Sequence, residues 1–203
     1  VAGVDYDVIN LQTKDFSERE DYFVRQIEDR KGNVFGFGIV IGNRNLEVTL
    51  KYANLVKEIS EDNIVVFGGP LPSAIPKLVL QKTCCDYVVM GEGEERFPNL
   101  VKNLLKGEPL TVIEGVLSRN CKDVDDSNIL LRLKKLKNLN IYSPPSYEQL
   151  NEEFYINYYK NRSYSCEIIG SRGCVANCTF CFKFIGTGYN CRTYKSVIEE
   201  INY

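Results

Sequence analysis

Residues 63–70 read Asn-Ile-Val-Val-Phe-Gly-Gly-Pro, a short apolar run that ends in a glycine turn. An apolar run of this length is typical of a strand buried on both faces of a parallel sheet. Two further segments follow the same plan: Val-Phe-Gly-Phe-Gly-Ile-Val-Ile at 34–41 and Asp-Tyr-Val-Val-Met-Gly-Glu-Gly-Glu-Glu at 86–95. These three segments decide the fold class of the first half of the chain.

Segments with helical spacing of apolar residues separate these strands. Helices are expected over 15–30, 46–59, 73–81 and 96–105, and a further strand over 4–12. Strands that alternate with helices and end in glycine predict an α/β fold with a doubly wound parallel sheet. Such sheets bind ligands outside the carboxyl ends of their strands. The turns at 68–70 and 91–94 lie there, although glycine turns of this kind also follow strands that bind nothing.

The last section carries a cysteine motif, Cys-Val-Ala-Asn-Cys-Thr-Phe-Cys at 174–181, with the spacing C-x3-C-x2-C. Three thiolates this close can hold three irons of a four-iron four-sulfur cluster, which leaves the fourth iron open. An open metal position is typical of a catalytic site rather than a structural one. Zinc or a closed cluster is the alternative, with Cys166 or Cys191 as the fourth ligand.

Composition excludes several classes of function. The chain has 203 residues, 44% of them hydrophobic and 26% charged, and a formal charge of −2. This balance gives no electrostatic support for a nucleic-acid partner. No apolar run of membrane-spanning length and no signal-peptide pattern is evident, so a reduced, cytoplasmic chain without a membrane partner is expected. The absence of histidine removes Ser-His and Cys-His catalysis and zinc bound by histidine.

The chain divides into three sections by composition. Residues 1–108 form the α/β section, 109–160 an irregular connector, and 161–203 a second α/β section with a strand at 166–170 and a helix at 196–203. One strand and one helix cannot bury a core, so this last section is expected to open a longer domain. The remaining cysteines are expected to be buried apolar residues: Cys84, Cys85, Cys121, Cys166 and Cys191.

At the cysteine motif the chain resembles the radical S-adenosylmethionine superfamily, in which C-x3-C-x2-C follows the first barrel strand. An aromatic residue often precedes the last cysteine of that family's motif, as Phe180 does here, and the lead-in Ser171-Arg172-Gly173 is similar. Upstream, the strings at 65–70 and 86–95 resemble the cobalamin-binding domain joined to one branch of this superfamily. The resemblance covers nearly the whole chain.

The resemblance implies a Rossmann-like cobalamin-binding domain over 1–108, without its first strand, and the start of a partial TIM-like (β/α) barrel over 161–203. The chain is then truncated at both ends and inactive alone. The implied cofactors are a 4Fe-4S cluster, S-adenosylmethionine and cobalamin. The implied cluster ligands are Cys174, Cys178 and Cys181. The implied cofactor contacts are Gly68, Gly69, Pro70, Gly91, Glu92, Gly93 and Phe180, and no catalytic residue is assigned.

Some of these residues have a plainer alternative. Phe180 can serve loop packing instead of the cluster or adenine, and Glu94 suits the positive start of a helix better than a ligand. An Arg-x-Arg-Ser string usual in the family is Asn190-Cys191-Arg192-Thr193 here, which leaves Arg192 as the one candidate for its role.

The implied activity is methyl transfer to an unactivated carbon of a small-molecule substrate, with flavodoxin or ferredoxin as electron donor. Oxidative cyclisation or rearrangement, and a non-catalytic cobalamin or iron–sulfur sensing module, are the alternatives.

Overall fold

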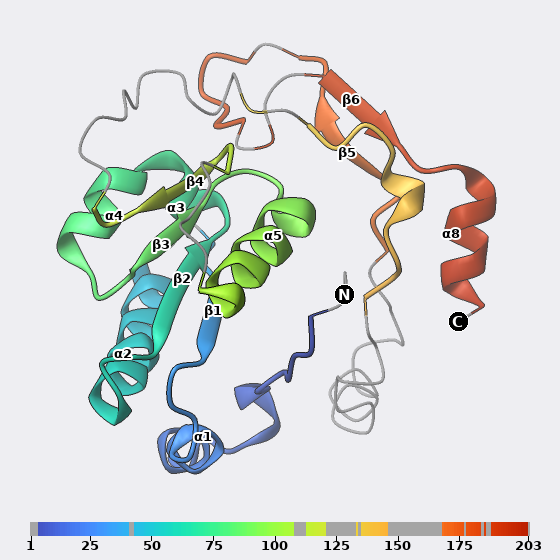
Figure 1. Cartoon of the computed structure of the whole chain (residues 1–203). Coiled ribbons are helices and arrows are strands. Elements are labelled where there is room, and N and C mark those ends of the chain that lie inside the picture. The colour runs from blue at the N-terminus through green and yellow to red at the C-terminus, as the bar shows by residue number, and fades with distance from the viewer. Residues whose placement is uncertain are drawn as a thin grey trace.

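A computed structural model of the chain describes residues 4–40, 43–107, 113–120, 133, 135–145, 168–176, 178–183, 185 and 188–202 (Figure 1). The main sheet has the order β1-β2-β3-β4. Its strands are β1 (Val34–Gly38), β2 (Ile64–Gly68), β3 (Tyr87–Val89) and β4 (Val116–Ser118). The first three strands are parallel and β4 is antiparallel to β3. The predicted α/β class with a mostly parallel sheet is therefore confirmed, and the expected connector supplies the last strand.

Helices cover both faces of this sheet. They are α1 (Arg19–Ile27), α2 (Asn43–Ile59), α3 (Pro70–Ala74), α4 (Pro76–Lys82) and α5 (Gly93–Lys106). The single helix expected over 73–81 is divided, because Pro76 disfavours helical geometry at the residue before it. Ile75 accordingly has φ −136° and ψ 52°.

The prediction of a strand over residues 4–12 is wrong. Residues 4–10 have no regular secondary structure, and a short 3-10 helix, η1 (Leu11–Thr13), follows them. In the described part of the chain β1 is the edge of the sheet and pairs only with β2, so residues 4–12 do not extend the sheet. Ile9 and Leu11 still pack against the core, which is the part of the alternating pattern that survives.

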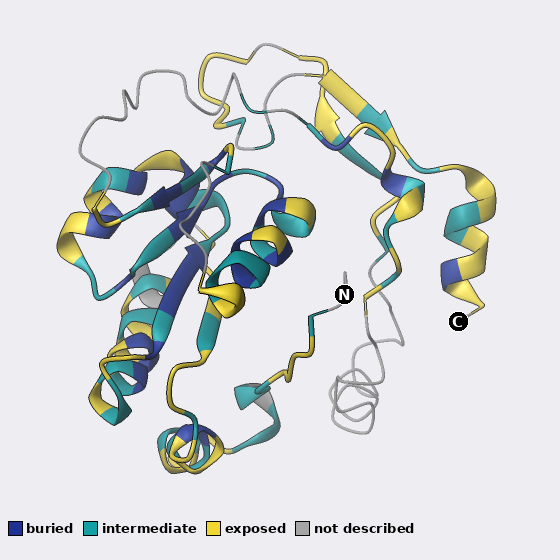
Figure 2. Ribbon diagram, in the orientation of Figure 1, coloured by how far each residue is buried: buried dark blue, intermediate teal, exposed yellow. Residues whose placement is uncertain are grey.

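Side chains of the strands alternate between two cores, as the two-residue period of a strand requires. Val65, Phe67 and Val88 face the larger core, where α1, α2, α3 and α4 pack. Val66 and Val89 face the smaller core beneath α5. Figure 2 shows the buried residues concentrated on the strands between these helices. Among the described residues the sheet is thus doubly wound, with α5 as the one helix on its face.

The C-terminal unit consists of β5 (Ser171–Cys174), β6 (Gly188–Cys191) and α8 (Tyr194–Ile201). Strands β5 and β6 are antiparallel, and a short 3-10 helix, η2 (Leu139–Ile141), lies nearby. Residues 166–167 of the expected strand lie outside the described residues, and 168–170 are not a strand. The described residues therefore do not show a barrel start. None of their helices has the length and hydropathy needed to cross a membrane.

Candidate cofactor-binding site at the glycine edge of the sheet

A cavity of about 630 Å³ opens at the carboxyl ends of β1, β2 and β3, and we call it the glycine-edge cavity. Four of the glycines predicted to contact a cofactor line it: Gly68, Gly69, Gly91 and Gly93. Gly36 and Gly38 of β1 complete the rim. At Gly38 and Gly93 a Cβ would meet nothing within 4 Å, so a flat ligand can approach the backbone there.

The turn after β2 needs glycine for a geometric reason. Gly69 has φ +96°, a conformation that residues with a Cβ rarely adopt. The end of β3 is held beside this turn, because the Gly91 N–H donates to Ser73 Oγ at 2.9 Å. The strand ends that form the cavity are thus fixed to α3 before any ligand binds.

The walls of the glycine-edge cavity are mostly apolar. Val34, Val66 and Val89 supply the sheet side, and Phe97 and Val101 of α5 supply the opposite side. A largely apolar cleft with a few polar groups at its rim is the common form of a cofactor site. The shape and chemistry fit the corrin ring of cobalamin, which is broad and apolar on its faces.

Pro70 and Glu92 do not line this cavity, although they are sequence neighbours of glycines that do. Pro70 begins α3 at its first position, where its missing N–H costs nothing. Glu92 precedes α5, and its side chain is only 6% exposed. The β1 glycines and Phe97 were not predicted. The Gly-x-Gly spacing of Gly36 and Gly38 was the available signal, since it places two glycines on one face of a strand.

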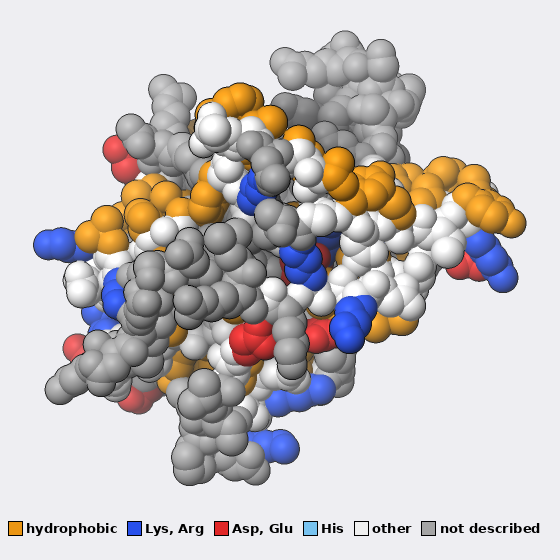
Figure 3. Space-filling model, turned by 90° about the horizontal axis from the view of Figure 1, so that it is seen from above, with side chains coloured by type: hydrophobic (Ala, Val, Ile, Leu, Met, Phe, Trp, Pro, Cys, Tyr) orange, Lys and Arg blue, Asp and Glu red, His pale blue; other side chains and the backbone are white. Residues whose placement is uncertain are grey.

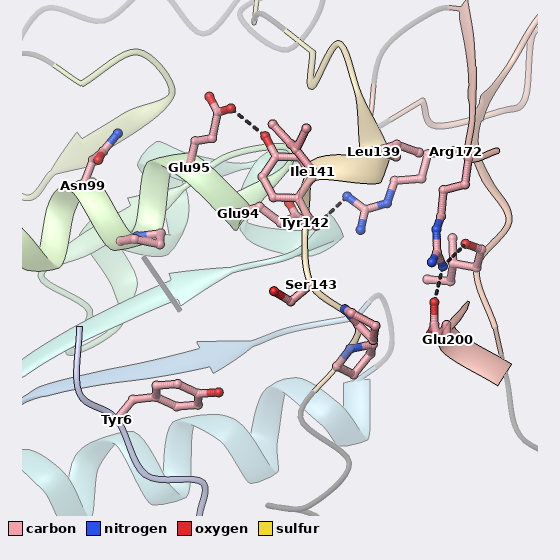
Figure 4. Close-up of a pocket in the computed structure, with 15 residues that line it drawn as sticks. Tyr6, Glu94, Glu95, Asn99, Leu139, Ile141, Tyr142, Ser143, Arg172 and Glu200 are labelled. Carbon is pink, nitrogen blue, oxygen red and sulfur yellow. Dashed lines mark hydrogen bonds and ion pairs between the residues drawn. The ribbon is translucent and has the colours of Figure 1, made fainter. Parts of the chain in front are cut away.

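A second cavity of about 760 Å³ lies between α5, the stretch around η2 and the C-terminal unit, and we call it the junction cavity. It shares Tyr6, Glu94 and Pro98 with the glycine-edge cavity, so the two are adjacent. The Tyr142 hydroxyl donates to Glu95 Oε1 at 2.5 Å across it (Figure 4). Burial and this bond raise the pKa of Tyr142.

Charged side chains join the N-terminal domain to the C-terminal unit beside the junction cavity. Glu92 Oε2 accepts from the Leu136 N–H at 2.9 Å, and Glu92 Oε1 accepts from Arg172 Nη1 at 3.2 Å. The same nitrogen lies 2.5 Å from Glu94 Oε1. Burial lowers the pKa of Arg172, but Glu94 and Glu92 together raise it. Seen from above, side chains of both charges lie beside one another on this side of the molecule (Figure 3).

Cys174 is the last residue of β5, and the other two cysteines of the motif lie on the exposed loop that follows it. Cys174, Cys178 and Cys181 are all exposed and form no disulfide. The Ala176 N–H donates to Cys174 Sγ at 3.4 Å, and the Cys181 N–H donates to the Cys178 carbonyl at 3.2 Å. Phe180 is 90% exposed, so loop packing does not account for it.

The donor set of the loop fits an iron–sulfur cluster by its chemistry. Soft thiolates select iron–sulfur clusters and zinc, and an N–H bond to sulfur suits a thiolate ligand. No three cysteine, aspartate or glutamate side chains converge on a single ion within the described residues. A four-iron cluster does not require three side chains around one ion, because each cysteine binds a different iron.

Arg192 is committed to a local network. It forms an ion pair with Glu200 of α8, and its Nη2 donates to the Ser196 carbonyl at 2.8 Å. The side chains of Arg192 and Glu200 are 10% and 3% exposed. The one arginine expected to fill the family's Arg-x-Arg-Ser role thus fixes α8 against the end of β6.

The remaining cysteines differ from one another. Cys85 is buried as predicted, and burial raises the pKa of its thiol to about 12. Cys84 is half-buried, with a pKa also raised by burial. Cys191 is exposed, so the prediction that it is buried is wrong: the residue ends β6, which is paired only with β5 and has no covering layer in the described chain. Cys121 and Cys166 lie outside the described residues.

Comparison with known proteins agrees with this geometry. Residues 2–101 match the family model described as "B12 binding domain". This half of the chain therefore belongs to the B12-binding domain family, and the expected cobalamin-binding fold is confirmed.

Two curated relatives extend the similarity past this domain. The chain is 32% identical over 154 residues to the uncharacterized methyltransferase PH0819 of Pyrococcus horikoshii, which covers 74% of this chain and 32% of the relative. It is 25% identical over 186 residues to the putative methylthiotransferase MJ0865 of Methanocaldococcus jannaschii. This match covers 89% of this chain and 37% of the relative. The chain thus spans about a third of the length of the relatives it matches.

Solved structures share the fold. The radical S-adenosylmethionine methyltransferase TsrM of Kitasatospora setae, with tryptophan and a S-adenosylmethionine analogue bound, superposes with a TM-score of 0.74 at 18% identity. That match covers 98% of this chain and 39% of TsrM. The same enzyme with cobalamin and a [4Fe-4S] cluster bound superposes with a TM-score of 0.73 at 17% identity. This match covers 98% of this chain and 40% of TsrM. The B12-binding domain expected from the sequence motifs is thus confirmed by the family model, and the chain shares its fold with TsrM.

Proposed function

We propose that this chain is the cobalamin- and cluster-binding part of a radical S-adenosylmethionine methyltransferase. One observation carries the proposal: six glycines line a single apolar cavity at the strand ends, and they lie in β1, in β2, in the turns after β2 and β3, and at the start of α5. Such an edge accepts a broad cofactor in van der Waals contact with backbone. Residues 1–108 are then the cobalamin domain, 109–160 the connector, and 161–203 the opening of the radical S-adenosylmethionine barrel.

The proposed division of roles follows from the side chains. Gly68, Gly69, Gly91 and Gly93 bind the corrin face through their backbone, while Val66 and Phe97 exclude water from it. Cys174, Cys178 and Cys181 hold the cluster and leave its fourth iron open for S-adenosylmethionine. When bound, the cluster supplies the electron for cleavage of S-adenosylmethionine, and cobalamin carries the methyl group.

Further parts of the proposal rest on the resemblance of the sequence motifs to the radical S-adenosylmethionine superfamily. The substrate is a small molecule with an unactivated carbon, and the electron donor is a small redox protein such as flavodoxin or ferredoxin. The Pyrococcus relative is named a methyltransferase, and TsrM is a radical S-adenosylmethionine methyltransferase. Both relatives support methyl transfer over cyclisation or rearrangement.

Cobalamin binding is tested with a cavity-filling variant of the chain. At Gly38 a Cβ meets nothing within 4 Å, so Gly38→Leu extends into the glycine-edge cavity without disturbing the fold. Gly170→Leu is the matched control, because Gly170 is equally open and lines none of the cavities. We expect Gly38→Leu to weaken hydroxocobalamin binding at least about tenfold, by the loss of contact area. Equal affinity of Gly38→Leu and the wild-type chain would overturn the site.

Cluster binding is tested separately. After anaerobic reconstitution with iron and sulfide, the Cys178→Ala chain is expected to lose cluster absorbance and iron while it keeps cobalamin. A wild-type chain that takes up cobalamin but no iron would instead support a cobalamin-binding module without cluster chemistry.

A further inference from the structure

Three segments far apart in the sequence meet at Glu92. Its two carboxylate oxygens accept from the Leu136 N–H and from Arg172, which are 44 and 80 residues away. Leu136 is tied in turn to β6, because Asn190 Nδ2 donates to its carbonyl at 2.5 Å. We call Glu92, Glu94, Leu136, Arg172 and Asn190 the Glu92 junction.

The side chains of the Glu92 junction are largely buried, so each charged group needs a partner within the junction. The side chain of Glu92 is 6% exposed and that of Arg172 is 26% exposed. A buried carboxylate is stable only when its oxygens have partners, and here each oxygen has one. Glu94, at the first turn of α5, shares Arg172 with Glu92 and is 30% exposed. A guanidinium is suited to this task because its several N–H groups lie in one rigid plane.

The junction lies between the two parts of the proposed site. Glu92 stands between Gly91 and Gly93, which line the glycine-edge cavity. Arg172 lies in β5, two residues before Cys174, the first cysteine of the motif. The bond between Glu92 and Arg172 therefore links the rim of one site to the strand that carries the other.

We propose that Arg172 is a positioning residue, which through Glu92 and Glu94 holds the cysteine strand at a fixed place relative to the glycine-edge cavity. This inference rests on the proposed function, in which both sites are filled. It assigns Glu92 to the contact between the two parts of the chain, and not to cobalamin.

The first test measures the position of the strand in the chain without cofactors. In Arg172→Met, amide exchange over 168–176 and at Leu136 is expected to rise about tenfold, because a charge-assisted bond is lost. Arg172→Lys keeps the charge but not the planar fork, and is expected to rescue part of the protection. Arg25→Met is the control, since Arg25 is an exposed arginine of α1. Unchanged exchange of β5 in Arg172→Met would overturn the proposal.

The second test separates positioning from simple stabilisation. In the chain loaded with cob(II)alamin and a reduced cluster, the power saturation of the cobalt EPR signal reports the separation of the two centres. We expect Arg172→Met to keep both cofactors but shift the half-saturation power, and Arg172→Lys to shift it less. An identical value in wild type and Arg172→Met would overturn the positioning role. A wild-type chain that binds neither cofactor would overturn the proposed function, while the exchange result would still show whether Arg172 holds the strand.

Discussion

A Cβ atom at Gly69 would lie 2.8 Å from the carbonyl oxygen of Ile39. The two strand ends cannot separate to relieve this contact, because the Ile39 N–H donates to the Gly68 carbonyl at 2.8 Å. The edge that carries the proposed cobalamin site therefore depends on the absence of one side chain.

Replacing Gly69 by alanine is expected to lower the free energy of unfolding by about 2–3 kcal/mol, since φ +96° is strained for alanine and the new Cβ meets backbone. Gly38→Ala is the control, because its Cβ meets nothing within 4 Å and a strand glycine costs conformational entropy. Urea unfolding followed by circular dichroism measures both. Equal stability of the two variants would contradict this account of the turn.

Asn63, directly before β2, joins α2 to the residue before β1 from a fully buried position. Its Nδ2 donates to the Val56 carbonyl at 3.1 Å, and its Oδ1 accepts from the Asn33 N–H at 3.2 Å. Asn63→Ala is expected to cost about 1–3 kcal/mol in urea unfolding, because it removes the side-chain partner of the Asn33 N–H and leaves the Val56 carbonyl with the Ser60 N–H alone. Asn99→Ala, on the exposed side of α5, should change stability by less than about 0.5 kcal/mol. A small effect at both positions would show that water replaces the amide of Asn63.

The ion pair of Arg192 and Glu200 is nearly buried, so removal of Arg192 takes a cationic partner from a buried carboxylate. Arg192→Met is expected to weaken the local stability of α8 by about 3 kcal/mol, measured by amide exchange over 194–201. Lys51→Met removes the pair with Glu20, whose side chains are 53% and 47% exposed, and should have a much smaller effect because solvent screens this pair. Protection of α8 that survives in Arg192→Met would contradict a structural role for this arginine.

The thiol of Cys85 makes stability depend on alkaline pH. Burial raises its pKa from 9.0 to about 12, so above pH 9 the unfolded chain releases a proton that the folded chain keeps. Stability is therefore fully present below pH 9 and falls by up to about 1.4 kcal/mol per pH unit between 9 and 12.

Anaerobic urea unfolding at pH 7.5 to 10.5, with reductant present, tests this dependence. Cys85→Ala is expected to be less stable at pH 7.5, because it leaves a cavity, but to lose less stability on going to pH 10.5. The stability of the variant should still fall somewhat with rising pH, since burial also raises the pKa of Cys84 and Tyr87. Parallel pH profiles for the variant and the wild type would refute the assignment to Cys85.

The sheet was predictable from sequence because its strands are continuous apolar runs buried on both faces. The stretch around Tyr6 and Val8 misled the prediction, because an alternating pattern records which side chains are buried and not whether a neighbouring strand is present. The prediction of one helix over 73–81 relied on the spacing of apolar residues. It overlooked that a proline disfavours helical geometry at the residue before it, and the helix is divided at Pro76 for this reason.

The site was predictable only in part. Glycines at strand ends carry a local signal, and four of those predicted do line the cavity. The role of Glu92 has no local signal in the sequence, because its partners Leu136 and Arg172 are 44 and 80 residues away and belong to other parts of the fold. A carboxylate beside a glycine turn looks the same in sequence whether it faces a ligand or a distant arginine.

The pairing of β5 with β6 has a consequence for cluster assembly. Cys174 is the register partner of Gly188, so the pairing joins the two ends of the loop that contains Cys178 and Cys181. Gly173 permits this approach, since a Cβ there would lie in contact with the Gly188 carbonyl. The entropy of closing that loop is lost when the chain folds and not when metal arrives. If the proposed cluster binds here, the affinity of the motif for it should depend on the stability of a strand pair that contains only one of the three proposed ligands.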